Sequence, residues 1–447
     1  MKLYFIVFIA ILSSHPVLSQ QFNFEGSFNS KAIASNKQEI PFWLHTNSDY
    51  TLSTLTNASI TADLSATLSF STFKLNAGAA VYARDGVPNS VQRRDLYLQF
   101  ENSWLLATLG AKKREEVLDG LSSSSQNFLW SHNARPIPGL LLEANNPFKI
   151  LKIFSIDWGI AHYELNDNRF VDGTHLHYKR LAIITTLNES NKITAKVQHF
   201  AQWGGTSPDY GKLSSDFRDF MDVFFTLSPS NGKIDGEILN KLGNHLGSYF
   251  LEYEFKNKLG TFSIYHEHPF EDGSGSGFRN FPDGISGLHF KPHNQNLISA
   301  VLYEYTNTID QSGRFGVSGR DNYFSNGIYE SGWTYENNII GTPFVLYGDP
   351  ESVAGNDKRM ISNRSIAHHF GATGNINRFN WKIKSTYTTY LGTYSRPLTP
   401  KWKYWYNYAS LSYKAKNIGT LTILGGLDFS NISTTTLGGG VEYTYTF

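Results

Sequence analysis

The printed sequence closes with TLGGGVEYTYTF (residues 436–447), and this stretch indicates what kind of strand the chain forms. Its residues alternate between an apolar or aromatic face and a small or polar face, as in a β-strand between two different environments. Chain ends usually fray, because their few contacts do not offset the entropy lost on ordering. We therefore expect this strand to be paired on both sides, with one face against an apolar medium. That face carries Leu437, Val441, Tyr443, Tyr445 and Phe447.

The same alternation recurs along the chain and predicts an all-β protein. It is clear in residues 381–387 and 421–429, where apolar side chains alternate with polar or small ones. A soluble β-sandwich would show the same alternation, so this pattern alone leaves both architectures open. About eighteen strand candidates begin near residues 27, 57, 73, 91, 103, 138, 152, 174, 192, 247, 259, 284, 297, 365, 379, 402, 419 and 434.

The connections between these candidates separate the two architectures. Short turns at one end and long loops at the other are typical of outer-membrane barrels, which have an even number of strands. We therefore predict a closed antiparallel transmembrane β-barrel of about 18 strands over residues 20–447, although residues 307–364 could hold two further strands. The tight turns are 101–103, 187–192, 256–260, 375–378 and 416–419, and the long loops include 269–283, 341–364 and 392–401.

The amino terminus predicts export. Lys2 and the apolar run 3–12, followed by a plausible cleavage site after Ser19, form the pattern of a signal peptide over residues 1–19. The chain has no cysteine, and no later segment resembles a transmembrane helix, so only a closed barrel could span a membrane. A formal net charge of +1 provides no electrostatic case for nucleic acid. We expect the outer membrane of a Gram-negative bacterium.

One segment, SSDFRDFMDVFFTL (residues 214–227), has helical periodicity instead. Its large apolar residues recur at the spacing of one helix face, and acidic residues near its start favour helix initiation. We predict an amphipathic helix that packs on the barrel or plugs it; a helix lying on the membrane surface is the alternative. The apolar face consists of Phe217, Phe220, Met221, Phe224 and Phe225.

Residues that could support catalysis or metal binding are sparse. The nucleotide-binding motifs and the G-x-S-x-G nucleophile elbow are missing, so no catalytic residue is predicted. Histidine pairs could bind a metal, but the sequence supplies no third or fourth ligand, and we expect polar residues lining the lumen, with no metal and no cofactor. The glycine-rich stretch 269–284 is interpreted as a surface loop, with a calcium loop as the alternative. The pairs are His175 and His177, His266 and His268, and His368 and His369.

The stretch PKWKYWYNYASLSYKAK (residues 400–416) contains a row of aromatic residues at alternate positions. Further along the same face the residues become small and polar, which places the row on the lumen side at the outer end of the strand. Aromatic rings pack against the C–H faces of sugars, so the row could be a platform for saccharides. The alternative is packing against loops that fill the lumen. The row is Trp402, Tyr404, Tyr406 and Tyr408.

Three segments of the chain resemble the capsule assembly protein Wzi family of Gram-negative outer membranes: residues 93–143, 198–205 and 244–288. The resemblance implies an eighteen-stranded barrel with a helical plug. It also implies a lectin-like surface protein that helps to anchor capsular polysaccharide, and neither an export channel nor an enzyme. The carboxyl-terminal third is similar to the family only in its strand pattern.

The leading hypothesis is therefore a non-enzymatic outer-membrane protein that binds capsular or other surface polysaccharide. The alternative is an outer-membrane diffusion porin, and an outer-membrane hydrolase is a third hypothesis. The expected partners are surface polysaccharide, outer-membrane lipid and the β-barrel assembly machinery, which would recognise the last strand through Phe447. The predicted carbohydrate-binding residues are Trp203, Arg279, Trp402, Tyr404 and Tyr406.

Overall fold

The structure is a computed structural model that describes residues 21–227, 233–234, 237–238, 241–271, 273–311, 322–348 and 359–447. The predicted signal peptide, residues 1–19, lies outside the described residues. None of the helices in the described part of the chain is long and apolar enough to cross a membrane.

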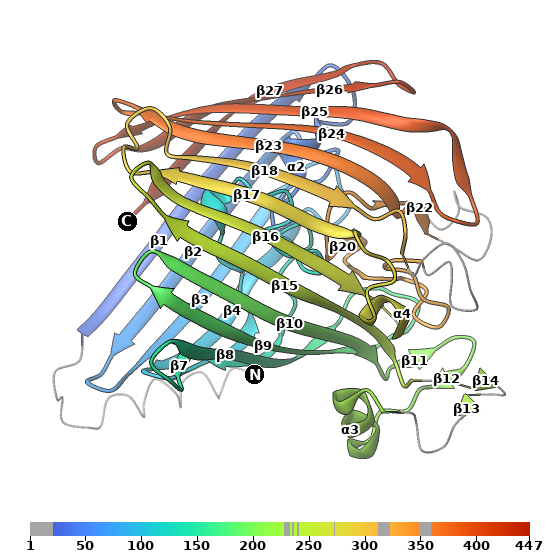
Figure 1. The fold of residues 1–447 in the computed structure, drawn as a ribbon. Helices are drawn as coiled ribbons and strands as arrows, with labels where there is room; N and C mark the ends of the chain where they lie inside the picture. Colours follow the sequence, from blue (N-terminus) through green and yellow to red (C-terminus); the bar gives the residue numbers. More distant parts are fainter. Residues whose placement is uncertain are drawn as a thin grey trace, which may run out of the picture.

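Eighteen antiparallel strands close into a barrel, as the alternation and the loop pattern predict (Figure 1). Each strand pairs with the next along the chain, and β27 pairs back with β1, for example through Phe28 and Tyr445. Closure leaves no strand edge unpaired. The barrel strands are β1 (Gln21–Ser35), β2 (Ala58–Ser69), β3 (Phe73–Arg84), β4 (Val91–Asn102), β5 (Leu105–Ala111), β6 (Gly139–Ala144), β8 (Phe154–Leu165), β9 (Thr174–Asn188), β10 (Asn191–Trp203), β15 (Asn244–Lys256), β16 (Gly260–Phe270), β17 (Gly284–Pro292), β18 (Ala300–Asn307), β23 (Arg364–Ile376), β24 (Phe379–Gly392), β25 (Pro397–Ala415), β26 (Gly419–Ser430) and β27 (Thr436–Thr446).

The remaining elements are short and lie in the connections. β7 continues the pairing of β6 with β8 after a brief interruption. The two further strands that residues 307–364 could hold are not in the barrel, because the short strands described there pair only with one another. These elements are β7 (Phe148–Lys149), β11 (Thr206–Ser207), β12 (Gly211–Lys212), β13 (Lys233–Ile234), β14 (Glu237–Ile238), β19 (Thr334–Tyr335), β20 (Asn338–Ile339), β21 (Leu346–Tyr347), β22 (Met360–Ser362), α2 (Phe42–His45), the 3₁₀ turn η1 (Leu118–Gly120), α3 (Phe217–Phe225) and α4 (Gly273–Ser276).

The two ends of the barrel differ as expected. The tight turns between β4 and β5, β9 and β10, β15 and β16, β23 and β24, and β25 and β26 share one end with both termini of the described chain. The opposite end, at the right of Figure 1, carries the long connections 36–57, 112–138, 204–243 and 308–363. The predicted long loop 392–401 is shorter than expected, because β25 already begins at Pro397.

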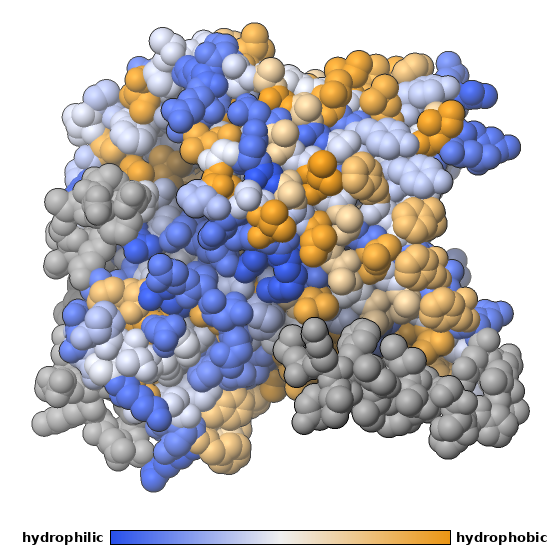
Figure 2. All heavy atoms as spheres, turned by 180° about the vertical axis from the view of Figure 1, so that it is seen from behind, coloured by the Kyte–Doolittle hydropathy of each residue, from blue (hydrophilic) through white to orange (hydrophobic). Residues whose placement is uncertain are grey.

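The wall has an apolar outer face and a polar inner face. In β27, Val441 is 52% exposed on the outside, whereas its neighbour Glu442 faces inward and pairs with Lys31 at 3.2 Å. Apolar side chains likewise cover much of the right-hand half of the surface in Figure 2. This is the alternation that the closing stretch of the sequence predicts.

A plug of irregular chain fills part of the lumen. We use this name for residues 112–138 and 322–348, which enter from the long-loop end. Their buried residues form the largest apolar core of the molecule together with inward-facing residues of the wall. The members include Leu121, Phe128, Trp130, Trp333 and Ile340 from the plug, and Phe200, Phe250 and Leu302 from the wall.

Two buried carboxylates of the wall hold the plug by its backbone and hydroxyl groups. Glu304 accepts hydrogen bonds from Ser122 Oγ at 2.6 Å and from the Ser123 amide at 2.7 Å. Glu267 accepts one from the Phe128 amide at 2.6 Å. Buried polar groups that lack regular secondary structure need such partners, because leaving them unpaired is costly.

The amphipathic helix forms where the sequence predicts it, and of the two predicted placements it packs on the barrel and does not plug it. α3 begins with a capping box between Asp216 and Asp219. Its buried Val223 packs with Ala201 and Trp203 of β10, which point outward because their neighbours Phe200 and Gln202 point into the lumen. α3 therefore lies against the outer wall near the long-loop end, and the plug that the family resemblance implies is built from irregular loops instead.

Candidate functional site: the outer cavity

A cavity of about 650 Å³ opens at the long-loop end of the lumen. We call it the outer cavity. Three aromatic residues form its floor: Tyr404 stacks on Tyr406 with ring centroids 5.2 Å apart, and Phe42 of α2 stacks on Tyr406 at 4.2 Å. Tyr406 is buried, whereas Tyr404 is half-buried and keeps part of its ring toward the cavity. The aromatic row thus lies on the lumen side of β25, as predicted.

The glycines of the last two strands make room for this floor. A Cβ atom at Gly426 would lie 2.5 Å from Pro41 Cβ, and one at Gly438 would lie 2.7 Å from Pro41 Cδ. Pro41 precedes α2, so the glycine-rich strands let α2 approach the wall and place Phe42 over Tyr406. Gly438 belongs to the TLGGG run that opens the closing stretch of the sequence.

Polar groups surround the aromatic floor. Asp428 accepts a hydrogen bond from the Phe42 amide at 2.7 Å through one oxygen, while Oδ1 is buried without a partner among the described residues. Amide and hydroxyl groups complete the lining. An aromatic floor with convergent polar groups is the usual composition of a small-molecule site. The polar lining includes Asn133, Asn337, Asn338, Tyr347, Ser430 and Ser433.

Two inner cavities, of about 550 and 720 Å³, lie on the other side of the plug and share a charged wall. Lys112, Lys113, Arg114 and Glu115 line both of them. They extend toward the tight-turn end, since Phe447 lines one and Asn145 the other.

A thin layer separates the outer cavity from the inner ones. Asp49 and His132 line both inner cavities, while their chain neighbours Tyr50 and Asn133 line the outer one. His132 Nδ1 donates to Asp49 at 2.8 Å, and the Asp49 amide donates to the His132 carbonyl at 2.8 Å. Burial of His132 lowers its pKa, but the hydrogen bond and the charge of Asp49 outweigh burial, so the pKa is raised above its ordinary value.

The structure brings together three of the five predicted carbohydrate-binding residues. Trp402, Tyr404 and Tyr406 pack in one cluster with Trp43 and Phe344. Lys401 and Lys403, which flank Trp402, are exposed on the opposite face of the strand.

The other two predicted residues lie elsewhere. Trp203 is buried on the outer wall beneath α3, and Arg279 is exposed in the loop between β16 and β17. That loop also uses its carboxylates internally: Asp283 accepts from the amides of Asp310 and Gln311 and from the Tyr323 hydroxyl. Burial raises the pKa of Asp283 to about 7, although these hydrogen bonds oppose the shift. The carboxylates of this loop therefore hold the plug through hydrogen bonds to Tyr323 and Phe324.

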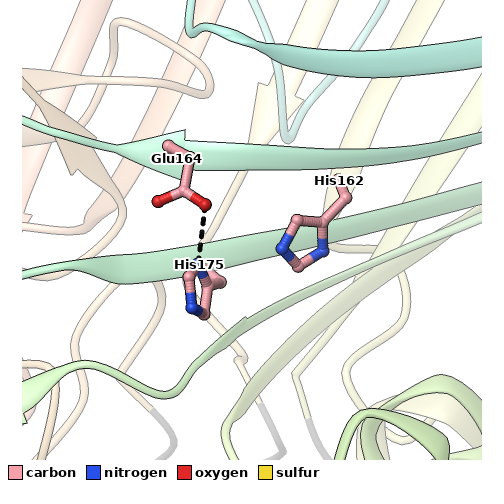
Figure 3. A group of neighbouring side chains, drawn as sticks. All are labelled: His162, Glu164 and His175. Atoms are coloured by element: carbon pink, nitrogen blue, oxygen red, sulfur yellow. Dashed lines mark hydrogen bonds and ion pairs between the residues drawn. The ribbon is translucent and has the colours of Figure 1, made fainter. Parts of the chain in front are cut away.

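Most of the paired histidines face outward, where lumen-lining residues were expected. His175, His177, His266, His268 and His368 alternate with inward-facing neighbours. Only His369 of these pairs faces inward, where Nε2 lies 2.7 Å from the Leu121 carbonyl of the plug. His175 has two possible co-ligands on the adjacent strand, His162 and Glu164 (Figure 3). The spacing of residues along the sequence does not identify them, because they lie more than ten residues from His175 in the chain.

The geometry of a hydrolase is incomplete among the described residues. His266 Nδ1 lies 2.8 Å from Ser286 Oγ, which is within hydrogen-bond reach. His266 Nε2 is buried without a hydrogen-bond partner in the described part of the chain, so this pair has no third group there that would orient the imidazole as a base.

Among known proteins, only solved structures match the chain, and they match it in fold. No family model and no curated protein matches the chain. The solved structure of Pseudomonas aeruginosa OccK3 (OpdO) is 10% identical with a TM-score of 0.50, and the match covers 96% of each chain. OccK5 (OpdH) of the same organism is 10% identical with a TM-score of 0.49, covering 95% of this chain and 98% of that one. OprD of P. aeruginosa is 7% identical with a TM-score of 0.48, covering 96% and 95%. The likeness to OccK3 shows a shared barrel fold.

Proposed function

We propose that the protein is an outer-membrane barrel that binds a surface polysaccharide in its outer cavity and is not an enzyme. The observation that carries this proposal is the aromatic floor formed by Phe42, Tyr404 and Tyr406 beside the polar groups of the cavity. Flat aromatic faces suit the C–H faces of pyranose rings, while amide and carboxylate groups suit their hydroxyls. The apolar outer face of the closed barrel suits a lipid bilayer.

The resemblance to the Wzi family supports the same proposal from the sequence side. That family's role would make this chain a lectin-like anchor for capsular or another surface polysaccharide. The buried plug supports a binding role because it narrows the lumen, and its residue Phe344 packs against the aromatic floor in one cluster with Tyr406.

Replacing Tyr404 of the floor and Trp402, which packs in the same cluster, together with alanine tests the aromatic floor. We expect the double variant to release cell-associated polysaccharide into the medium, with loss of most retention, while the barrel still assembles. The measurement compares cell-bound with released polymer in a deletion strain complemented with each variant. Trp405→Ala, on the outward face of the same strand, is the matched control. Unchanged retention in the double variant would remove the floor from the binding site.

An outer-membrane diffusion porin is the second candidate. OccK3, which shares the fold, belongs to that class, and this comparison favours the porin over the polysaccharide anchor. The cavities on both sides of the Asp49 and His132 layer also favour it, since a small movement of that layer would join them. Barrels of this size can hold an aqueous channel.

Conductance in planar bilayers distinguishes the two candidates. A steady open-channel current from the purified wild-type barrel would support the porin and contradict a closed anchor. A current that appears only when the plug is loosened would support the anchor.

We also propose that the last strand directs assembly, through the β-barrel assembly machinery, after export by the predicted signal peptide. Phe447 exchanges backbone hydrogen bonds with Gly26 at 2.9 Å and lies beside Phe24 on the outer face, so it closes the seam of the barrel. Deleting Phe447 should reduce the fraction of folded barrel in the membrane several-fold, measured by heat-modifiable mobility on gels. Normal assembly without Phe447 would contradict this proposal.

A further inference from the structure

Three potential metal ligands meet on the outer wall near the long-loop end, at a place that neither candidate function uses. His162 and Glu164 lie on β8, and His175 lies on the neighbouring strand β9 (Figure 3). Glu164 stands directly opposite His175 in the strand register, and His162 stands two residues earlier on the same face. One ligand atom from each residue lies within 4.8 Å of the others.

We infer that His162, Glu164 and His175 form a binding site for a divalent transition-metal ion of the Zn²⁺ class. Two imidazoles with one carboxylate are a donor set that suits Zn²⁺, and with three protein ligands the ion keeps an open position. Glu164 Oε1 and His175 Nδ1 already lie 3.0 Å apart. Tetrahedral ligands at Zn²⁺ distances stand about 3.3 Å apart, so a side-chain rotation of His162 would complete the triangle.

The site is accessible from the exterior and is bordered by aromatic side chains. The side chain of Glu164 is 51% exposed and that of His175 is 27% exposed, so the open position faces the exterior. The aromatic rings of Trp203 and Phe220 flank the imidazoles, with the Trp203 ring centroid 5.2 Å from that of His175. Such a wall restricts the rotamers of the ligands and shields one side of the ion from water.

The chain also makes room for His175. Gly204 has φ +65°, and a Cβ atom there would lie 3.0 Å from Cδ2 of His175. This turn leads from β10 toward α3, so a bound ion would brace β8 and β9 beside the segment that carries the helix. The site would then stabilise the long connection 204–227 on the outer wall.

Zinc binding by the full-length barrel tests the inference. The protein is purified in detergent with a tag that contains no histidine, stripped of metal, and titrated with Zn²⁺ and with Co²⁺. We expect one ion per chain and the visible absorption bands of Co²⁺ in a site of low coordination number. His162→Ala with His175→Ala should weaken binding about tenfold or more, and Glu164→Gln should weaken it and change the Co²⁺ spectrum.

The matched control is His266→Ala with His268→Ala, which removes another outward-facing histidine pair from β16. This control should bind Zn²⁺ as the wild type does, and heat-modifiable mobility confirms that each variant is folded. Absence of binding by the wild type would overturn the inference, as would equal binding by the wild type and the His162 and His175 double variant.

Discussion

The plug and helix α3 are both long insertions between barrel strands, yet they end on opposite faces of the same wall. The plug has no regular periodicity, and it is held inside by buried carboxylates and a large apolar core. α3 has clear helical periodicity, and it lies outside against Trp203 and Ala201. An amphipathic pattern therefore identifies a segment that needs an apolar partner, but it does not reveal on which side of the wall that partner lies.

The largest expected effect is on conductance, when the hydrogen bonds that hold the plug to the barrel wall are removed. Replacing Glu267 and Glu304 together with alanine leaves the groups that they bind unpaired in a buried place, at about 1–3 kcal/mol for each group. We expect the plug to loosen and a steady current through the barrel to appear in planar bilayers, where the plugged wild-type barrel stays closed.

Glu189→Gln, in the exposed turn between β9 and β10, is the control and should leave conductance unchanged. A double variant with wild-type conductance would show that the plug does not limit flow through the lumen.

A smaller effect should follow from detaching α3. Val223→Ala with Phe220→Ala removes contacts of the helix with the outer wall, and such large-to-small changes cost on the order of a few kcal/mol. We expect faster proteolytic cleavage within residues 204–227 and no change in conductance.

Phe217→Ala, which truncates a side chain that is 78% exposed, is the matched control for α3. A rise in conductance on detaching α3 would contradict the separation between an inner plug and an outer helix.

The smallest effect should be a pH dependence at the layer between the cavities. The raised pKa of His132 means that its stabilisation is fully present below the ordinary value of 6.5 and is lost as pH rises through the higher folded pKa. Asp49→Asn removes the partner, at about 1 kcal/mol. We expect a lower thermal midpoint for the variant near pH 6, and a difference from wild type that shrinks with rising pH above the folded pKa. A pH-independent difference would contradict the charged pair.

Much of the barrel could be predicted because the strand repeat is local. Successive side chains point to opposite faces, so residues 436–447 by themselves reveal a lipid-like face and a lumen-like face. The same reasoning placed Tyr404 and Tyr406 inside. It does not assign a face to Trp203, because the lumen-facing residues of β10 are also apolar where the plug covers them, as Phe200 is. Polarity therefore stops distinguishing the two faces near the plug.

The outward histidines show a second limit. His162 and Glu164 lie on a different strand from His175, and only the register between β8 and β9 brings them together. A spacing of two residues along one strand reveals a shared face, but it does not reveal the neighbours across the strand. No pattern in one sequence specifies that register.

Local sequence patterns are enough to reveal the strands, their approximate number, the sorting of turns and loops, and a helix within residues 214–227, because each depends on the period of nearby residues. Tertiary structure decided which insertion fills the lumen and which lies outside, and how Phe42 comes to rest on Tyr406. It also decided which ligands meet on the outer wall. These outcomes depend on contacts between residues far apart in the chain. Such contacts form, and stabilise the protein, only once the barrel has closed.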